Sequence, residues 1–138
     1  MPIKSPKQKG ASGELEAARL LEKWAHECGC PHDLERNLEQ VRSGGSDLNG
    51  VRGLEIEVKR VEQFAINSWW KQVCEVAAET GKRPFLMHRA NRKQWSFRVR
   101  AWVYPHAGKP LDIDMDLATA ELWFKAYLKD QENEIPKA

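Results

Sequence analysis

The segment Arg42–Lys59 constrains the fold of this chain more than any other part of the sequence. It begins with a glycine-rich turn, passes through Asp47, and ends in a run in which apolar and charged residues alternate. The apolar positions are Leu54, Ile56 and Val58, and the charged positions are Glu55, Glu57 and Lys59. Because alternation with a period of two is typical of a strand with one buried face, the run predicts a short strand with two carboxylates and an amine on its other face.

This charged face favours a metal site. We expect Asp47 to lie at the end of a preceding strand and Glu57 on its neighbour, so that both carboxylates can bind one cation. Mg²⁺ takes oxygen ligands, and few protein carboxylates suffice when water and substrate phosphate complete its coordination. Lys59 would point into the same cleft, where its ammonium group can hold or polarise an attacking water while the metal stabilises charge on the phosphate.

A purely structural interpretation of the same pattern stays open. Alternating charges on a strand are usually solvated, and Glu57 and Lys59 would then belong to a surface ion-pair ladder. The domain would bind nucleic acid or another partner without catalysing a reaction. Under this interpretation, replacement of Lys59 by alanine leaves binding intact and removes nothing else.

The arrangement of acids and lysine resembles the PD-(D/E)XK nuclease superfamily. Asp47 matches the first acid, and Glu57-Val58-Lys59 matches the acid-x-lysine element. An upstream run, Gly10-Ala11-Ser12-Gly13-Glu14, resembles the helix-borne glutamate of the branch that includes archaeal and phage Holliday-junction resolvases. The resemblance extends from about residue 10 to residue 90, and it departs from the motif at Ser46, where the family has its most dispensable residue, a proline.

The resemblance implies a restriction-endonuclease-like fold of the α/β (α+β) class, with a central mixed β-sheet flanked by helices. It implies bound Mg²⁺, for which Mn²⁺ can substitute, with Asp47, Glu57 and the carbonyl group of Val58 as ligands. Glu14 would support a second ion or a metal-bound water, and Lys59 would orient the nucleophile. The product of phosphodiester hydrolysis would carry a 5'-phosphate and a 3'-hydroxyl.

The implied partner is DNA, with branched duplex as the expected substrate and a homodimer as the expected assembly. We expect selectivity by shape, because a small domain has little room to read bases. Six residues are candidates for contacts with DNA: Lys9, Arg36, Arg42, Ser43, Arg60 and Arg89. A nuclease of the same fold that acts in restriction, repair or phage DNA processing would share the catalytic residues, and only substrate tests separate it from a resolvase.

Charge is distributed unevenly along the chain, although the formal net charge is only +2. The segment from Lys82 to Lys109 is rich in lysine and arginine and contains no acid, whereas the residues from Asp112 onward are mostly acidic. This asymmetry favours a domain that presents one positive face to phosphates. The alternative is a set of unrelated, solvated side chains.

A length of 138 residues suits one domain. We assign a flexible basic arm to residues 1–9, a single nuclease-like domain to residues 10–130 and a polar tail to residues 131–138. No apolar run approaches the length of a membrane span, and no signal peptide is recognisable. The expected location is therefore the cytoplasm of a prokaryotic or phage-infected cell.

The three cysteines of the chain fit a reducing compartment, because they cannot form a full disulfide framework. Cys28 and Cys30 lie between two histidines, which raises the possibility of a zinc site. Ligand pairs in structural zinc sites are usually separated by two or more residues, so this one-residue gap is tight. The other interpretation is a helix end, where Gly29 and Pro31 stop the helix.

Hydrophobic periodicity predicts the remaining elements. The predicted helices are Ser12–Glu27, Ala65–Thr80 and Leu117–Lys129, and the further strands are Asp33–Val41, Arg83–Arg89 and Gln94–Tyr104. On the second helix, Trp69 and Trp70 belong to the apolar stripe and are predicted to be core residues or a subunit contact. On the last helix, Leu122 is among the residues predicted to supply apolar surface.

Overall fold

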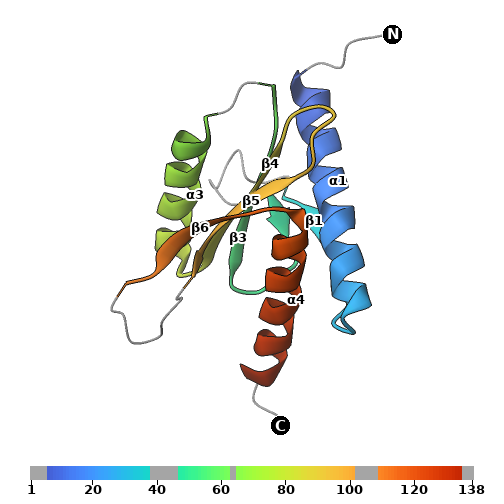
Figure 1. Cartoon of the computed structure of the whole chain (residues 1–138), viewed down its shortest axis with the longest axis vertical. Coiled ribbons are helices and arrows are strands. Elements are labelled where there is room, and N and C mark those ends of the chain that lie inside the picture. Colours follow the sequence, from blue (N-terminus) through green and yellow to red (C-terminus); the bar gives the residue numbers. More distant parts are fainter. Residues whose placement is uncertain (1–5, 38–46, 63–64, 102–108, 135–138) are drawn as a thin grey trace.

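The computed structural model describes residues 6–37, 47–62, 65–101 and 109–134, and for residues 6–11 and 133–134 it describes the backbone. These ranges hold helices and strands in the following order: α1 (Pro6–Glu27), β1 (Glu35–Arg36), β2 (Leu48–Asn49), β3 (Leu54–Arg60), α3 (Ile66–Thr80), β4 (Arg83–Arg89), β5 (Ser96–Ala101), β6 (Leu111–Met115) and α4 (Leu117–Glu134) (Figure 1).

The strands form one sheet of six, and their order in the sheet is the order in the chain. Strands β3 and β4 are parallel, and every other neighbouring pair is antiparallel. The parallel pair requires a crossover connection, and α3 provides it. The sheet is therefore mixed, with helices on both faces, as the family resemblance implied.

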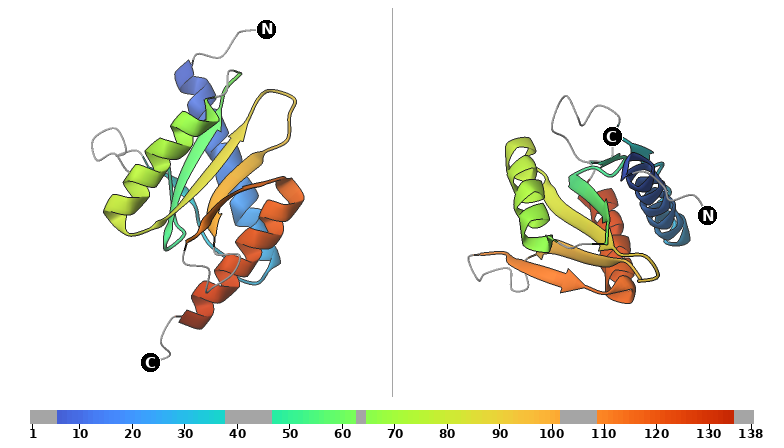
Figure 2. Two further views of the ribbon diagram at one scale, coloured as in Figure 1. Left: turned by 60° about the vertical axis from the view of Figure 1, so that its left-hand side comes forward. Right: turned by 90° about the horizontal axis from the view of Figure 1, so that it is seen from above.

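Helices α1 and α4 cover one face of the sheet, and α3 covers the other (Figures 1 and 2). The larger core lies on the α1 and α4 side, where Leu54, Ile56 and Val58 of β3 are buried as the alternation predicted. Aromatic rings fill this core, and Trp24 of α1 packs against Phe97 and Phe124 with ring centroids 5.8 and 6.1 Å apart. Such burial is the main source of stability for a domain of this size.

A smaller core lies between the sheet and α3. It consists of Trp70, Val73 and Leu86, with Trp69 partly buried beside them. The prediction that the tryptophan pair belongs to the core is thus confirmed for Trp70, which is 6% exposed. Helix α3 ends at Gly81, as predicted, because this residue adopts the left-handed conformation that glycine tolerates.

Several element boundaries differ from the predicted ones. Helix α1 begins at Pro6, so the last residues of the predicted basic arm are helical. The first strand is only Glu35–Arg36, and residues 38–41 of its predicted range lie outside the described residues. Helix α4 continues to Glu134, five residues beyond its predicted end at Lys129. Its Leu122 is 72% exposed, so the prediction that this residue supplies packing surface was wrong.

Strand β6 was not predicted at all. It pairs with β5 at the edge of the sheet and places Met115 in the core and two aspartates on the α3 side. Aspartate is depleted in strands, which hides the alternation of Leu111, Ile113 and Met115. Among the described helices, none is both long and apolar enough to cross a bilayer.

Candidate active site

Asp47 and Glu57 lie side by side on the face of the sheet that α3 covers. Leu48 of β2 is paired with Ile56 of β3, and the Asp47 N–H donates to the Ile56 carbonyl at 2.9 Å. This bond holds Asp47 against the end of β3, and the carboxyl groups of Asp47 and Glu57 interact directly there. The structure thus brings the first two predicted acids together.

The carboxyl group of Asp47 is buried, with 6% of the residue exposed. Burial and the neighbouring negative charge of Glu57 raise the pKa of Asp47 to about 7, although a hydrogen bond from the Val58 N–H at 2.7 Å works in the opposite direction. Two carboxylates held this close repel each other unless they share a proton or bind a cation. The pair is therefore the kind of place where a divalent cation lowers the energy of the folded protein.

Lys59 completes the predicted constellation. Its Nζ lies 3.3 Å from Glu57 Oε1, and both side chains are half-buried. Because Glu57 and Lys59 are two residues apart on β3, they point to the same side of the sheet. The ammonium group therefore lies beside the carboxylate pair, as the acid-x-lysine element implied.

Glu55 shares this face of β3 but has a structural role. It is 2% exposed, accepts a hydrogen bond from the Thr80 hydroxyl at 2.8 Å and lies 3.6 Å from Lys82 Nζ. These contacts join the end of α3 to the start of β3. The charged face of β3 is therefore covered at Glu55, whereas Glu57 and Lys59 are partly exposed.

Glu14 occupies a different position from the acid pair. It is 8% exposed, and its carboxylate accepts a hydrogen bond from Arg36 Nε at 2.6 Å. Arg36 is paired with Leu48, the residue that follows Asp47. Because Leu48 faces the core on the α1 side of the sheet, Arg36 points to that side too. Among the described residues, no three His, Cys, Asp or Glu side chains gather closely enough to hold a metal ion. In this arrangement Glu14 therefore does not join the acid pair formed by Asp47 and Glu57.

The residues predicted to contact DNA are found in ion pairs where their side chains are described. Arg36 pairs with Glu14, whereas Arg60 and Arg89 lie 3.7 and 2.8 Å from Glu16. The side chain of Lys9 and the residues Arg42 and Ser43 lie outside the described part of the chain.

Sequence reasoning missed Glu16, which joins α1 to the carboxyl ends of β3 and β4. Besides the two arginines, it accepts a hydrogen bond from the Trp95 indole N–H at 3.0 Å. One turn earlier, Gly13 packs so closely on Arg60 that an added Cβ would lie 2.8 Å from the Arg60 Cβ. The sequence offers no local signal for this cluster, because its partners are distant along the chain.

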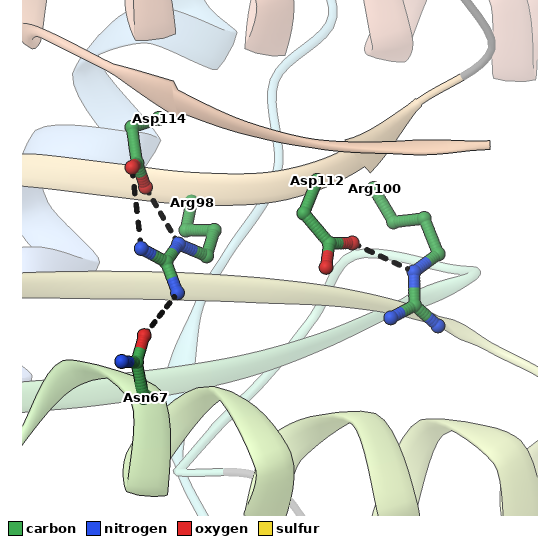
Figure 3. Close-up of polar contacts among 5 residues, drawn as sticks. All are labelled: Asn67, Arg98, Arg100, Asp112 and Asp114. Carbon is green, nitrogen blue, oxygen red and sulfur yellow. Dashed lines mark hydrogen bonds and ion pairs between the residues drawn. The ribbon is translucent and has the colours of Figure 1, made fainter.

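Two arginines of the basic segment are paired with acids of the next strand. Arg98 donates to both oxygens of Asp114 at 2.6 and 3.2 Å and to the Asn67 side chain at 3.2 Å, and Arg100 donates to Asp112 at 2.9 Å (Figure 3). The acids come from β6, the strand that the sequence did not reveal. The charges of these two arginines are therefore balanced locally, and a single positive face stays a prediction.

The cysteine-rich segment is a helix end. Helix α1 stops at Glu27, and Gly29 follows with a φ of 76°, a left-handed conformation. Burial, together with a contact to Glu132, raises the pKa of Cys30 to about 11, and within the described residues no three potential ligands gather around it to hold a metal ion. The helix-end interpretation is thus the better one for the described residues.

Comparison with known proteins agrees with this geometry. Residues 5–104 match the model of the family described as "Phage putative PDDEXK endonuclease". Among solved structures, the chain is similar to Hjc of Archaeoglobus fulgidus, a Holliday junction resolvase, with a TM-score of 0.51 and 15% identity over 82% of this chain and 95% of that one. No curated protein matches.

The structural likeness shows a common fold: the mixed sheet and flanking helices are those of a nuclease of the resolvase type. The family match covers well over half of the chain and includes Glu14, Asp47, Glu57 and Lys59. The expected superfamily is thus confirmed. The chain belongs to the PDDEXK endonuclease family of phages.

Proposed function

We propose that this protein is an Mg²⁺-dependent endodeoxyribonuclease that hydrolyses phosphodiester bonds in branched DNA. The observation that carries the proposal is the position of Asp47 beside Glu57, with Lys59 Nζ 3.3 Å from the latter. A buried pair of like charges destabilises a fold, and such pairs persist where function requires them.

The residues fit a hard divalent cation. Asp47, Glu57 and the Val58 carbonyl would supply oxygen ligands only, which is the donor set that Mg²⁺ and Mn²⁺ prefer. The cation would supply charge stabilisation at the phosphate and lower the pKa of a bound water.

The protein groups around this site would position the reactants. The Val58 N–H fixes Asp47 beside Glu57 through the hydrogen bond at 2.7 Å. Lys59 would hold the attacking water by donating to its oxygen, and its positive charge would favour the phosphate beside it. Glu14 would act from the α1 side, through water, on condition that its ion pair with Arg36 opens. Hydrolysis would leave a 5'-phosphate and a 3'-hydroxyl.

Branched DNA is the proposed substrate because the fold is that of a resolvase and the arginines near the site are already paired with acids. Arg36, Arg60 and Arg89 are poorly placed to read base edges, so shape rather than sequence would guide recognition. A homodimer would present two such sites to the two strands of a junction. Both cuts would be made in the cytoplasm of a prokaryotic or phage-infected cell.

The test is a cleavage assay on a synthetic four-way junction, a matched linear duplex and a single strand, each with Mg²⁺ and with EDTA. We expect Mg²⁺-dependent cleavage of the junction, lost in Asp47→Ala. Size-exclusion chromatography with light scattering measures the assembly.

Three other outcomes separate the alternatives. Equal cleavage of all three DNAs would identify a general nuclease of the same family. DNA binding without cleavage in either Mg²⁺ or Mn²⁺ would contradict the proposed chemistry and favour a binding domain. Cleavage that survives Asp47→Ala would place the active site elsewhere.

A further inference from the structure

A cavity of about 480 Å³ lies at the carboxyl ends of β3 and β4, at the top of the sheet in Figure 1. Its lining comes from the end of β4, the turn into β5 and the start of α4, and includes His88, Lys93, Gln94 and Ser96. The volume lies within the range of pockets that hold small organic molecules. Neither the family match nor the proposed chemistry assigns it a role.

The cavity adjoins the candidate active site through the sheet register. Lys59 of β3 is paired with His88 of β4, and His88 is paired with Ser96 of β5. Because neighbouring strands are about 5 Å apart, His88 is one strand spacing from Lys59 and Ser96 is two. All three residues point to the α3 side, so a chain of DNA bound at Lys59 has the cavity beside it.

The walls of the cavity are fixed by contacts within the protein. His88 is 6% exposed and packs against Trp69, with ring centroids 6.0 Å apart. On the α1 side, the guanidinium group of Arg89 lies 5.6 Å from the Trp95 ring centroid, and Glu16 binds both residues. The cavity is consequently formed before any ligand binds, which lowers the entropic cost of binding.

The polar groups of the lining suit a nucleoside better than a free anion. Its two acids are held by backbone N–H groups: Glu62 accepts from Asn91 at 3.1 Å, and Asp116 accepts from Thr119 at 2.8 Å. These two carboxylates would repel a negatively charged ligand inside the cavity. Gln94 and Ser96 are exposed and supply both donors and acceptors, as the edge of a base requires.

We propose that this cavity binds the base of an unpaired nucleotide next to the cleaved phosphodiester, with Ser96 and Gln94 at the base edge and Lys93 at the outer phosphate. The inference rests on the proposed nuclease function and specifies its substrate. An unpaired base enters a pocket at little cost, whereas a paired base must first leave the stack. The cavity therefore gives branched or distorted DNA an advantage over regular duplex.

The experiment uses a duplex with one unpaired 2-aminopurine next to the bond that the enzyme cuts, and the same duplex with an abasic site there. Both are bound in EDTA to wild type, to Ser96→Tyr, which fills the cavity, and to Ala126→Tyr, which adds the same group at an exposed position further along α4. We expect the base-containing DNA to bind wild type and Ala126→Tyr about 10-fold more tightly than the abasic DNA, with a change in 2-aminopurine emission. Ser96→Tyr should lose both effects and keep its affinity for the abasic DNA.

The inference is overturned if wild type shows no preference and no emission change, or if both persist in Ser96→Tyr. Gln94→Trp, also at an exposed lining residue, replaces Ser96→Tyr if that variant does not fold. Adding Mg²⁺ to the same complexes separates the two proposals. Cleavage without an affinity preference or emission change would contradict base binding in the cavity and leave the nuclease function standing. A preference and an emission change without cleavage would contradict the nuclease function and leave a nucleotide-binding site.

Discussion

Two groups of charged residues share the α3 side of the sheet and differ in kind. Where β2 meets β3, Asp47 and Glu57 place like charges next to each other, and Asp47 is buried. At the β6 edge, Arg98 and Asp114 pair opposite charges, and Asp114 is largely exposed to solvent. The first group opposes folding as long as both carboxylates are charged, whereas the second group needs no further partner.

The pKa directions express this difference. Burial and Glu57 raise the pKa of Asp47 to about 7, while the hydrogen bond from Arg98 holds the pKa of Asp114 below its usual value. A raised carboxyl pKa opposes folding above pH 4, and a lowered one favours it. The comparison teaches that the proposed functional site is marked by the unbalanced charges of Asp47 and Glu57. The ion pairs of Arg98 and Arg100 contain more basic residues but are balanced.

The largest expected effect is on the rate of cleavage, and it should distinguish two lysines that each contact a glutamate of β3. Lys59→Ala should lower the rate of junction cleavage about 1000-fold, because the group that holds the attacking water is lost. Lys82→Ala, which removes the contact to the buried Glu55 at 3.6 Å, should keep the rate within about 3-fold, since Lys82 contacts neither member of the acid pair. Single-turnover kinetics measure both rates. Similar losses in the two variants would mean that Lys59 has no special part in cleavage.

Asp47→Asn should stabilise the protein in the absence of metal. At pH 8 the Asp47 carboxyl is above its pKa of about 7 and charged, so removing its charge relieves repulsion and should raise the free energy of unfolding by about 2 kcal/mol. The matched change Asp114→Asn removes an attraction and should lower it by at most about 1 kcal/mol. Urea denaturation in EDTA measures both values, and a destabilised Asp47→Asn protein would show that the acid pair is structural.

The exposed pair should matter little for activity. Arg98→Ala removes the hydrogen bonds to Asp114 and Asn67 and should cost about 1 kcal/mol of stability, because both remaining groups regain water. Cleavage of the junction should change by less than about 2-fold. A large loss of cleavage at unchanged stability would mean that Arg98 contacts DNA.

The smallest expected effect is on the stability of the protein at low pH. The pKa of Asp112 and of Asp114 is lowered in the folded state, by hydrogen bonds from Arg100 and Arg98, respectively, against the opposing effect of burial. Their contribution to stability is complete above the unfolded pKa of about 4 and is lost as the pH falls through the lower folded values. Wild type should therefore lose slightly more stability between pH 4 and pH 2 than the double variant Asp112→Asn/Asp114→Asn, as thermal denaturation measures. An equal loss in both proteins would mean that the pairs do not form in solution.

Much of the fold followed from local pattern. Strand β4 occupies its predicted range Arg83–Arg89, and α3 begins one residue later than predicted, at Ile66. Both elements carry strong periodicity, because each buries a continuous apolar stripe. That Asp47, Glu57 and Lys59 lie together also followed from sequence, since their alternation and spacing are local, and their catalytic role stays a prediction.

The remaining features depend on contacts between distant segments. The pairing of Arg98 and Arg100 with β6 is invisible in composition, which shows the basic and acidic segments apart. Glu14 was expected to support a second ion or a metal-bound water, and its contact with Arg36 arises instead from the register of β1 with β2. Glu16 has no signal of its own, because Arg89 and Trp95 reach it only after the sheet has formed.

The most direct test of the account is a calorimetric titration of Mn²⁺ into the protein without DNA. Wild type and Arg98→Ala should show the same saturable binding heat, because the Asp47 and Glu57 oxygens are the proposed cation ligands. Asp47→Asn should show none. Undiminished binding in Asp47→Asn, or no binding in wild type, would contradict the claim that the buried acid pair is a metal site.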